Sequence, residues 1–249
     1  MTATETAHTA LTEAEVERFR RDGYLGPYSL CAPDEMAEVR ADVERVLETD
    51  APDHESADHN RHLDFRCIYD LATRPPIVDR MAGLYGEDLL MWRTNFFNKG
   101  PGAGEIPWHQ DYAYWPLEPP IIISAWLAID PSTEKNGCLQ VIPGSHRAPL
   151  PHIPAEDGML FYEMADPQFV EHDKAIKLEM QPGEFILFNE RTLHHSEPNT
   201  SERRRIGMAV RMVVPIVKVL EWDSPNHGLL QVRGADPLGF NRVVAPPPA

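Results

Sequence analysis

The spacing of apolar residues changes once along the chain, near residue 89. Before that point apolar side chains recur every three or four residues, which is the spacing of helices with one buried face. After it, short segments rich in Ile, Val, Phe and Trp alternate with turns that contain proline and glycine. No helical pattern of 10–15 residues separates successive segments, so a parallel sheet with crossover helices is disfavoured.

Three helices are expected in the first part of the chain. Thr12 and Glu15 have the spacing of a capping box, and the helix that they begin should end at Gly23. Further helices are expected over residues 33–47 and 76–85.

The segment between the second and third helices, residues 49–62, is acidic and has no apolar period. It contains His54, His59 and His62 at irregular spacing, which favours a solvated loop over a metal site. We expect a mobile loop here that serves as a lid over a binding site.

Six strands are expected in the second part of the chain. The 24 prolines are about twice the usual share of ~5%, and several form Pro-Gly turns between these strands. Helices followed by many short strands favour a mainly β fold with flanking helices, a double-sheet jelly roll with the helices packed outside. We expect a single domain over residues 1–249, with disordered ends at 1–10 and 245–249. The expected strands are residues 90–98, 121–130, 139–142, 175–180, 184–189 and 206–214.

Charge and composition exclude several classes of protein. The chain has 23 basic and 39 acidic residues, a formal net charge of −16, so it lacks the overall basic character of nucleic-acid-binding proteins. The same charge disfavours anionic membranes, and no apolar run approaches the ~18 residues of a membrane span. Three widely separated cysteines and the lack of a signal-peptide pattern predict a cytoplasmic protein with reduced thiols. We expect a monomer or homodimer that binds a small molecule.

A histidine and a carboxylate two residues apart, His109 and Asp111, follow the first long strand. Alternate side chains of an extended segment point the same way, so these two could occupy adjacent positions on one metal ion. The His-x-Asp spacing is common by chance, however, and taken alone it is better explained by an ion pair on a surface loop.

A second motif strengthens the metal interpretation. His194 and His195 follow the apolar segment 184–189, and Arg205 lies eleven residues beyond His194. A second histidine beside His109 and Asp111 would complete the two-histidine, one-carboxylate set of non-heme Fe(II) oxygenases, which leaves positions open for an oxoacid and O2. An arginine suits the far carboxylate of a dicarboxylate cosubstrate.

Together these motifs resemble the phytanoyl-CoA dioxygenase-like family of Fe(II)/2-oxoglutarate-dependent oxygenases, and the resemblance covers most of the chain. The matching segments are LTEAEVERFRRDGYL, WHQDYAYW, NGCLQVIPGSHR and HHSEPNTSERRRIGMAVR. The resemblance implies a double-stranded β-helix, with Fe(II), 2-oxoglutarate and O2 as cofactor and cosubstrates. It implies that His109, Asp111 and His194 bind iron, and that Ser196 and Arg205 bind the C5 carboxylate of 2-oxoglutarate. His195 is then a buried or hydrogen-bonded neighbour.

The resemblance also bears on the reaction. Halogenating relatives have Ala or Gly where this chain has Asp111, so hydroxylation or another oxidation is implied rather than halogenation. The chain also resembles the compact orthoester-forming (orthosomycin-type) oxygenases of sugar antibiotics, which close rings. We expect as substrate a small polar natural product or glycoside of secondary metabolism, such as those in antibiotic biosynthesis.

Other residues near the motifs are weaker candidates for the site. Asn95 and Lys99 share a strand face with Arg93 and could bind the C1 carboxylate of the cosubstrate, or serve as ordinary polar groups of a strand. Arg211 shares a face with Arg205 and could bind a substrate anion, although an internal salt bridge is favoured. The aromatic candidates for pocket walls are Trp108, Tyr112 and Tyr114.

Two other functions stay open on the sequence alone. The first is a different metal-dependent reaction in the same barrel, such as a cupin-like isomerase. The second is a metal sensor or scaffold that keeps the ligands without turnover. Succinate release that depends on 2-oxoglutarate would distinguish an oxygenase from both.

Overall fold

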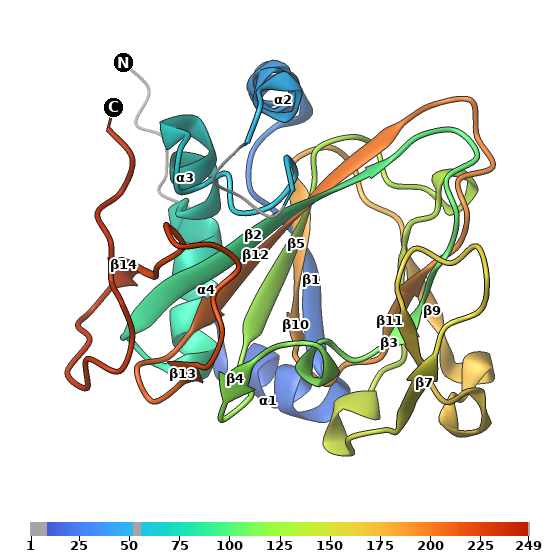
Figure 1. Ribbon diagram of the computed structural model, residues 1–249. Helices are drawn as coiled ribbons and strands as arrows, with labels where there is room; N and C mark the ends of the chain where they lie inside the picture. Colours follow the sequence, from blue (N-terminus) through green and yellow to red (C-terminus); the bar gives the residue numbers. More distant parts are fainter. Residues whose placement is uncertain (1–8, 52–55, 249) are drawn as a thin grey trace.

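The computed structural model describes residues 9–51 and 56–248. Two antiparallel sheets form its centre, and the helices cover the outer face of the larger one (Figure 1). The helices are α1 (Glu13–Asp22), α2 (Pro33–Glu48), α3 (Arg66–Ala72) and α4 (Pro75–Tyr85).

The larger sheet has six strands in the order β1-β10-β5-β12-β2-β14, and the smaller has four in the order β3-β11-β6-β9. The larger sheet contains β1 (Tyr24–Ser29), β2 (Leu89–Lys99), β5 (Ile123–Ala128), β10 (Glu184–Asn189), β12 (Arg205–Val213) and β14 (Leu230–Arg233). The smaller contains β3 (Ile106–His109), β6 (Leu139–Val141), β9 (Ile176–Leu178) and β11 (His194–Ser196). Two further pairs are β4 (Leu117–Glu118) with β13 (Lys218–Val219), and β7 (His152–Pro154) with β8 (Glu163–Ala165).

Strand alternation gives the larger sheet two different faces. On β12, Met208 and Val210 point to the helices, whereas Ala209 packs with Trp126 and Phe188 toward the smaller sheet. Because successive residues of a strand point to opposite faces, Arg205 and Arg211 share the inner face with Ala209. The space between the sheets therefore receives charged as well as apolar side chains.

The expected fold class is confirmed, and all six expected strands and three expected helices are present. Thr12 and Glu15 form the capping box, and Gly23 ends α1 with φ of +81°. The sequence analysis missed α3, β1, β14 and the shortest strands. A single domain over the whole chain stays a prediction. Within the described residues, no helix is long and apolar enough to cross a membrane.

The expected solvated loop over residues 49–62 is wrong for its last part. Asp58 and Asn60 extend the larger sheet, since Phe96 N–H donates to Asp58 O at 2.9 Å and Asn60 N–H donates to Thr94 O at 2.8 Å. Buried Arg61 explains this packing, because its guanidinium donates to the carbonyls of Val46, Thr49 and Ala57. His62 is also buried, and His54 lies outside the described residues.

At the chain ends, Thr9 Oγ1 donates a hydrogen bond to Asp79, and Pro247 is buried. The disorder expected at residues 1–10 and 245–249 stays a prediction. The remainder of the two expected segments, residues 1–8 and 249, lies outside the described residues.

Candidate active site

Three side chains that could bind one metal ion lie together between the sheets. His109 ends β3, Asp111 begins the short 3-10 turn after it, and His194 begins β11, where it pairs in register with His109. The Nε2 atoms of the two histidines lie 3.7 and 3.8 Å from Asp111 Oδ1. All three residues are 5% exposed or less. The structure therefore brings these three side chains close enough together to bind one metal ion, as expected from the sequence.

Backbone carbonyls orient both imidazoles. His109 Nδ1 lies 2.8 Å from Pro107 O, and His194 Nδ1 lies 2.9 Å from Thr192 O. A carbonyl only accepts, so each Nδ1 carries the proton and each Nε2 presents a lone pair toward Asp111. Burial lowers the pKa of both histidines, which keeps them neutral as metal binding requires.

Asp111 is held so that one oxygen faces the histidines. Its Oδ2 lies 3.3 Å from Arg211 Nε and 3.4 Å from Ser124 Oγ, while Oδ1 faces His109 and His194. Burial alone would raise the pKa of Asp111, but Arg211 and the two histidines lower it to about 2. The carboxylate is therefore ionised at neutral pH. Two neutral imidazoles and one carboxylate oxygen fit an Fe(II) ion with open coordination positions.

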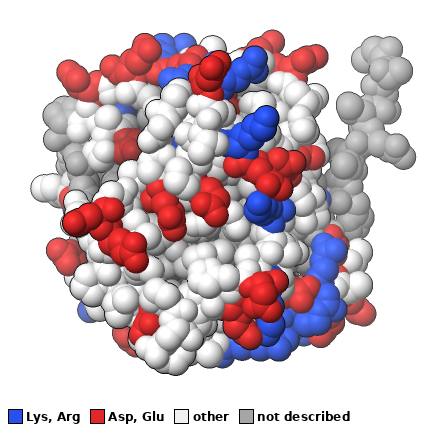
Figure 2. Space-filling view, turned by 90° about the vertical axis from the view of Figure 1, so that its right-hand side faces the viewer, with Lys and Arg blue, Asp and Glu red and all other residues white. Residues whose placement is uncertain are grey.

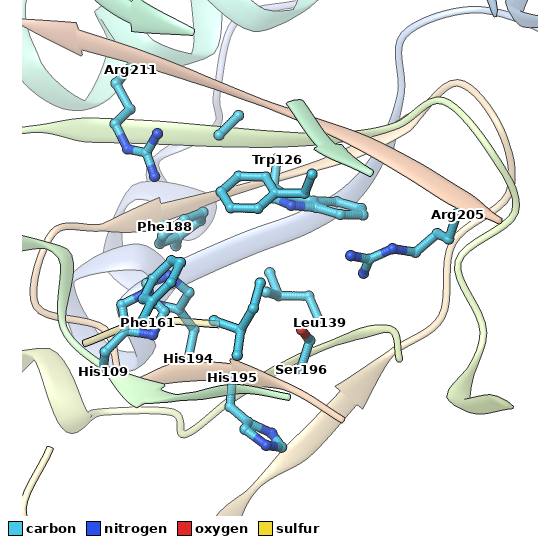
Figure 3. Close-up of a pocket in the computed structure, with 13 residues that line it drawn as sticks. His109, Trp126, Leu139, Phe161, Phe188, His194, His195, Ser196, Arg205 and Arg211 are labelled. Carbon is cyan, nitrogen blue, oxygen red and sulfur yellow. The ribbon is translucent and has the colours of Figure 1, made fainter. Parts of the chain in front are cut away.

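A pocket extends from this cluster to Arg205 (Figure 3). The Arg205 guanidinium is buried, lies 5.1 Å from the centre of the Trp126 ring and donates to Gly137 O at 2.6 Å. Gly207 leaves room for that ring, because a Cβ at this position would overlap it. Burial lowers the pKa of Arg205 to about 10, so the side chain is a cation at pH 7. Among the residues that the structure describes, its Nε has no hydrogen-bond partner, as expected of a group that binds an anion.

Ser196 and Lys99 lie at the same end of the pocket as Arg205. Ser196 lines the pocket, and Lys99 Nζ lies 2.9 Å from its Oγ and 3.1 Å from its carbonyl oxygen. Lys99 is buried, and burial together with nearby Arg205 lowers its pKa to about 7. Lys99 itself lines a neighbouring cavity, so this end of the pocket offers the Ser196 hydroxyl and the Arg205 guanidinium, with the Lys99 ammonium next to the hydroxyl. This set of groups suits a carboxylate.

Comparison with known proteins agrees with this arrangement. The family profile "Phytanoyl-CoA dioxygenase (PhyH)" matches residues 19–207, about three quarters of the chain. The chain belongs to the PhyH family. PhyH proteins are Fe(II)/2-oxoglutarate-dependent oxygenases, so the cofactors expected from the sequence are confirmed.

Individual relatives show how far the similarity extends. The solved structure "CytC3 with Fe(II) and alpha-ketoglutarate" is 30% identical with a TM-score of 0.76, covering 96% of this chain and 94% of that one. "Dioxygenase lolE1" of Epichloe uncinata is 28% identical and covers 84% of this chain and 85% of its own length. "Probable phytanoyl-CoA dioxygenase" of Caenorhabditis elegans is 31% identical over 54% of this chain, and the aligned part is 47% of the relative's length. The chain thus matches only about half of that relative.

His195 is separated from the metal cluster of this PhyH protein. Its Nε2 lies 3.0 Å from Glu105 Oε1, and its ring stacks on Trp108 with centres 4.8 Å apart. The expectation of a buried, hydrogen-bonded neighbour is confirmed. Burial lowers the pKa of His195 to about 4, so the ring is neutral.

The aromatic candidates separate into two groups. Trp108 points away from His109 on β3 and packs with Leu193 and Val170, so its assignment to the pocket wall is wrong. Tyr112 Oη donates to Leu150 O, and its ring is also absent from the pocket wall. The Tyr114 ring lies 5.5 Å from that of His109 and is thus nearer the metal cluster, but it too is absent from the described pocket wall.

The polar candidates Asn95 and Arg211 form one network with the metal cluster. Arg211 Nη1 donates to Asn95 Oδ1 at 2.9 Å while its Nε contacts Asp111. The favoured internal salt bridge of Arg211 is therefore present. The sequence analysis did not identify the seven apolar residues that line the described pocket. They are Phe97, Ile106, Trp126, Leu139, Phe161, Phe188 and Ala209.

Proposed function

We propose that this PhyH protein hydroxylates or oxidatively cyclises a small polar natural product or glycoside, with His109, Asp111 and His194 as its iron ligands. The observation that carries the proposal is the buried guanidinium of Arg205, which lines the same pocket as His109 and His194 of the candidate metal cluster. A five-carbon dicarboxylate could span from one to the other, with its oxoacid end on the metal.

In this proposal Arg205, Ser196 and Lys99 bind the far carboxylate of 2-oxoglutarate. Arginine supplies a planar pair of donors, and the ring of Trp126 fixes the plane of this guanidinium. When bound, iron with 2-oxoglutarate and O2 supplies an oxidant for an unactivated C–H bond, and 2-oxoglutarate leaves as succinate and CO2. One oxygen atom of O2 enters the substrate in hydroxylation, and the other enters succinate.

The remaining residues position these groups and exclude water. Phe97, Leu139 and Phe188 give the pocket apolar walls, which strengthen the electrostatic interactions inside it. Arg211 donates a hydrogen bond from Nε to Asp111 Oδ2 and so orients the carboxylate. It also donates from Nη1 to Asn95 Oδ1, which orients the guanidinium. We assign the oxidation to hydroxylation or ring closure rather than halogenation because the Asp111 carboxylate would bind the metal where halogenating relatives leave room for a halide.

The substrate side of the proposed site is a second cavity of about 200 Å3, which shares Phe97, Ile106 and Phe161 with the metal pocket. Its other lining includes Asp58, His59 and Asn98, which suit hydroxyl or amine groups of a small polar molecule. Acidic side chains are spread over the face shown in Figure 2, consistent with a neutral or cationic substrate.

The Arg205 end favours an oxygenase over the two alternatives, a cupin-like isomerase and a metal sensor. Neither alternative needs a buried cation aimed at a dicarboxylate, and burying such a cation is costly unless an anion meets it.

The proposal is tested first on the unmodified protein. Under anaerobic conditions with Fe(II), adding 2-oxoglutarate should produce the visible absorption band of the metal-oxoacid chelate. On admission of O2, succinate should form only when 2-oxoglutarate is present. A protein that binds Fe(II) but gives neither the band nor succinate would contradict the proposed function.

Lys99 predicts a pH dependence of 2-oxoglutarate binding. Its pKa of about 7 lies below the ordinary 10.5, so raising the pH through 7 removes a positive charge from the site. The Kd for 2-oxoglutarate should therefore rise between pH 6.5 and 8.5, by up to about tenfold per unit above pH 7. Over the same range the unfolded chain binds more protons than the folded one, so Lys99 makes unfolding less favourable as pH rises.

Anaerobic titrations at several pH values measure this dependence. The Lys99→Met variant should bind 2-oxoglutarate more weakly and lose the slope. A slope of the same size in Lys99→Met would assign the titration to another group.

A further inference from the structure

The walls of the metal pocket lie close together. The space in which a water molecule can move there is about 20 Å3, room for about one water molecule. Outward movement of one wall side chain would widen the pocket for a five-carbon dicarboxylate beside a metal ion.

Only one of the described side chains that line the pocket lies outside the strands, and it is the best candidate for that movement. Of the 13 described residues that line the pocket, twelve belong to strands of the two sheets, and Phe161 alone lies in a loop. The strand residues are fixed by pairing, as on β12, which is hydrogen-bonded to β2 on one side and β5 on the other. A loop side chain can leave without breaking a sheet.

Phe161 also occupies the position that separates the two cavities. Its ring centre lies 4.8 Å from that of His109 and 5.7 Å from that of Tyr114. Figure 3 shows it beside the two histidines of the metal cluster. Phe161 lines the outer cavity of about 200 Å3 as well, so one ring forms a wall of both spaces.

The loop that carries Phe161 is attached mainly at its base. Strands β7 and β8 pair there, Ala155 N–H donates to Tyr162 O, and Tyr114 Oη donates to Glu163 O. Toward the tip, Leu160 N–H donates to Glu105 O at 2.9 Å. Of the side chains on either side of Phe161, Leu160 is half exposed and lines the outer cavity, whereas Tyr162 extends into solvent and is 96% exposed.

We propose that Phe161 is the movable wall of the metal pocket. Its outward movement makes room for 2-oxoglutarate and joins the metal pocket to the outer cavity, from which a substrate C–H group reaches the metal. This inference rests on the proposed function, because it takes 2-oxoglutarate as the molecule that must enter.

The matched variants Phe161→Ala and Tyr162→Ala test the proposal. They shorten adjacent aromatic side chains, one over the metal pocket and one in solvent. Binding of 2-oxoglutarate to the anaerobic Fe(II) protein is followed by visible absorption in equilibrium titrations and in stopped-flow experiments. If only the open state binds, the apparent Kd equals the Kd of the open state divided by the fraction of molecules that are open. Phe161→Ala should lower that Kd roughly tenfold and speed association by a similar factor. Tyr162→Ala should stay within about twofold of the unmodified protein.

A third variant tests the loop while keeping the Phe161 ring. Leu160→Pro removes the N–H group that bonds to Glu105 O, so the tip should open more often and the Kd should also fall. It serves in place of Phe161→Ala should that variant fail to fold.

The possible failures are distinguishable. The proposal that Phe161 moves is wrong if the folded Phe161→Ala variant has an unchanged Kd and an unchanged association rate. The same result in Leu160→Pro would contradict it where that variant replaces Phe161→Ala. Equal gains in Phe161→Ala and Tyr162→Ala would also overturn it, since they would indicate general loosening of the loop. Absence of the absorption band in the unmodified protein would instead overturn the proposed function, and the inference with it.

Discussion

The His194→Gln variant is expected to lose Fe(II) binding and with it all succinate formation that depends on 2-oxoglutarate. The His194 Nε2 lone pair faces Asp111 Oδ1 at 3.8 Å inside a buried cluster whose other described members are His109 and Asp111. Loss of a residue that only supports a metal ligand typically costs ~10–100-fold in affinity, so loss of the ligand itself should cost more than about 100-fold. Anaerobic titration with Fe(II) measures the change directly.

The adjacent His195→Gln variant is the control for this experiment. Its ring stacks on Trp108 and contacts Glu105, away from the metal cluster. We expect its Fe(II) affinity to stay within about threefold of the unmodified protein, although its thermal stability should fall because a buried contact is lost. A larger loss of Fe(II) affinity in His195→Gln than in His194→Gln would mean that the ligand is assigned to the wrong histidine.

The fold was predictable where the signal was local. Thr12 and Glu15 identify the start of α1 through their own hydrogen bonds, and the longest strands contain dense runs of apolar residues. The structure of residues 58–62 was not predictable in the same way. Their sequence is polar and acidic, and they are held by Arg61, whose partners include carbonyl groups at the end of α2 and just beyond it. Such long-range contacts leave no periodicity in the sequence.

The same distinction applies to the site. His109, Asp111 and His194 could be identified because residue type and spacing are properties of the sequence. The error at Trp108 was avoidable, because the alternation that places His109 and Asp111 on one side of the chain places Trp108 on the other. Phe161 carried no sequence signal, since a loop between two short strands brings it to the metal cluster.

The Arg205→Met variant is expected to raise the Kd for 2-oxoglutarate by about 100-fold while leaving Fe(II) affinity nearly unchanged. Arg205 is buried at the end of the pocket opposite the metal cluster, so its loss removes a charge from the cosubstrate and not from the ligands. Truncating one partner of a buried charge pair typically costs ~2–5 kcal/mol of binding free energy, and a 100-fold rise in Kd lies within this range. Anaerobic titration of the Fe(II) protein with 2-oxoglutarate measures it.

Two further substitutions separate charge from geometry at this position. Arg204→Met is the matched control, because Arg204 pairs with Glu44 outside the pocket, and its Kd should not change. Arg205→Lys keeps the charge but loses the planar pair of donors, so its Kd should fall between those of the unmodified protein and Arg205→Met. An unchanged Kd in Arg205→Met would assign the carboxylate to Lys99 and Ser196 alone. The buried guanidinium would then serve the packing of Trp126 rather than the cosubstrate.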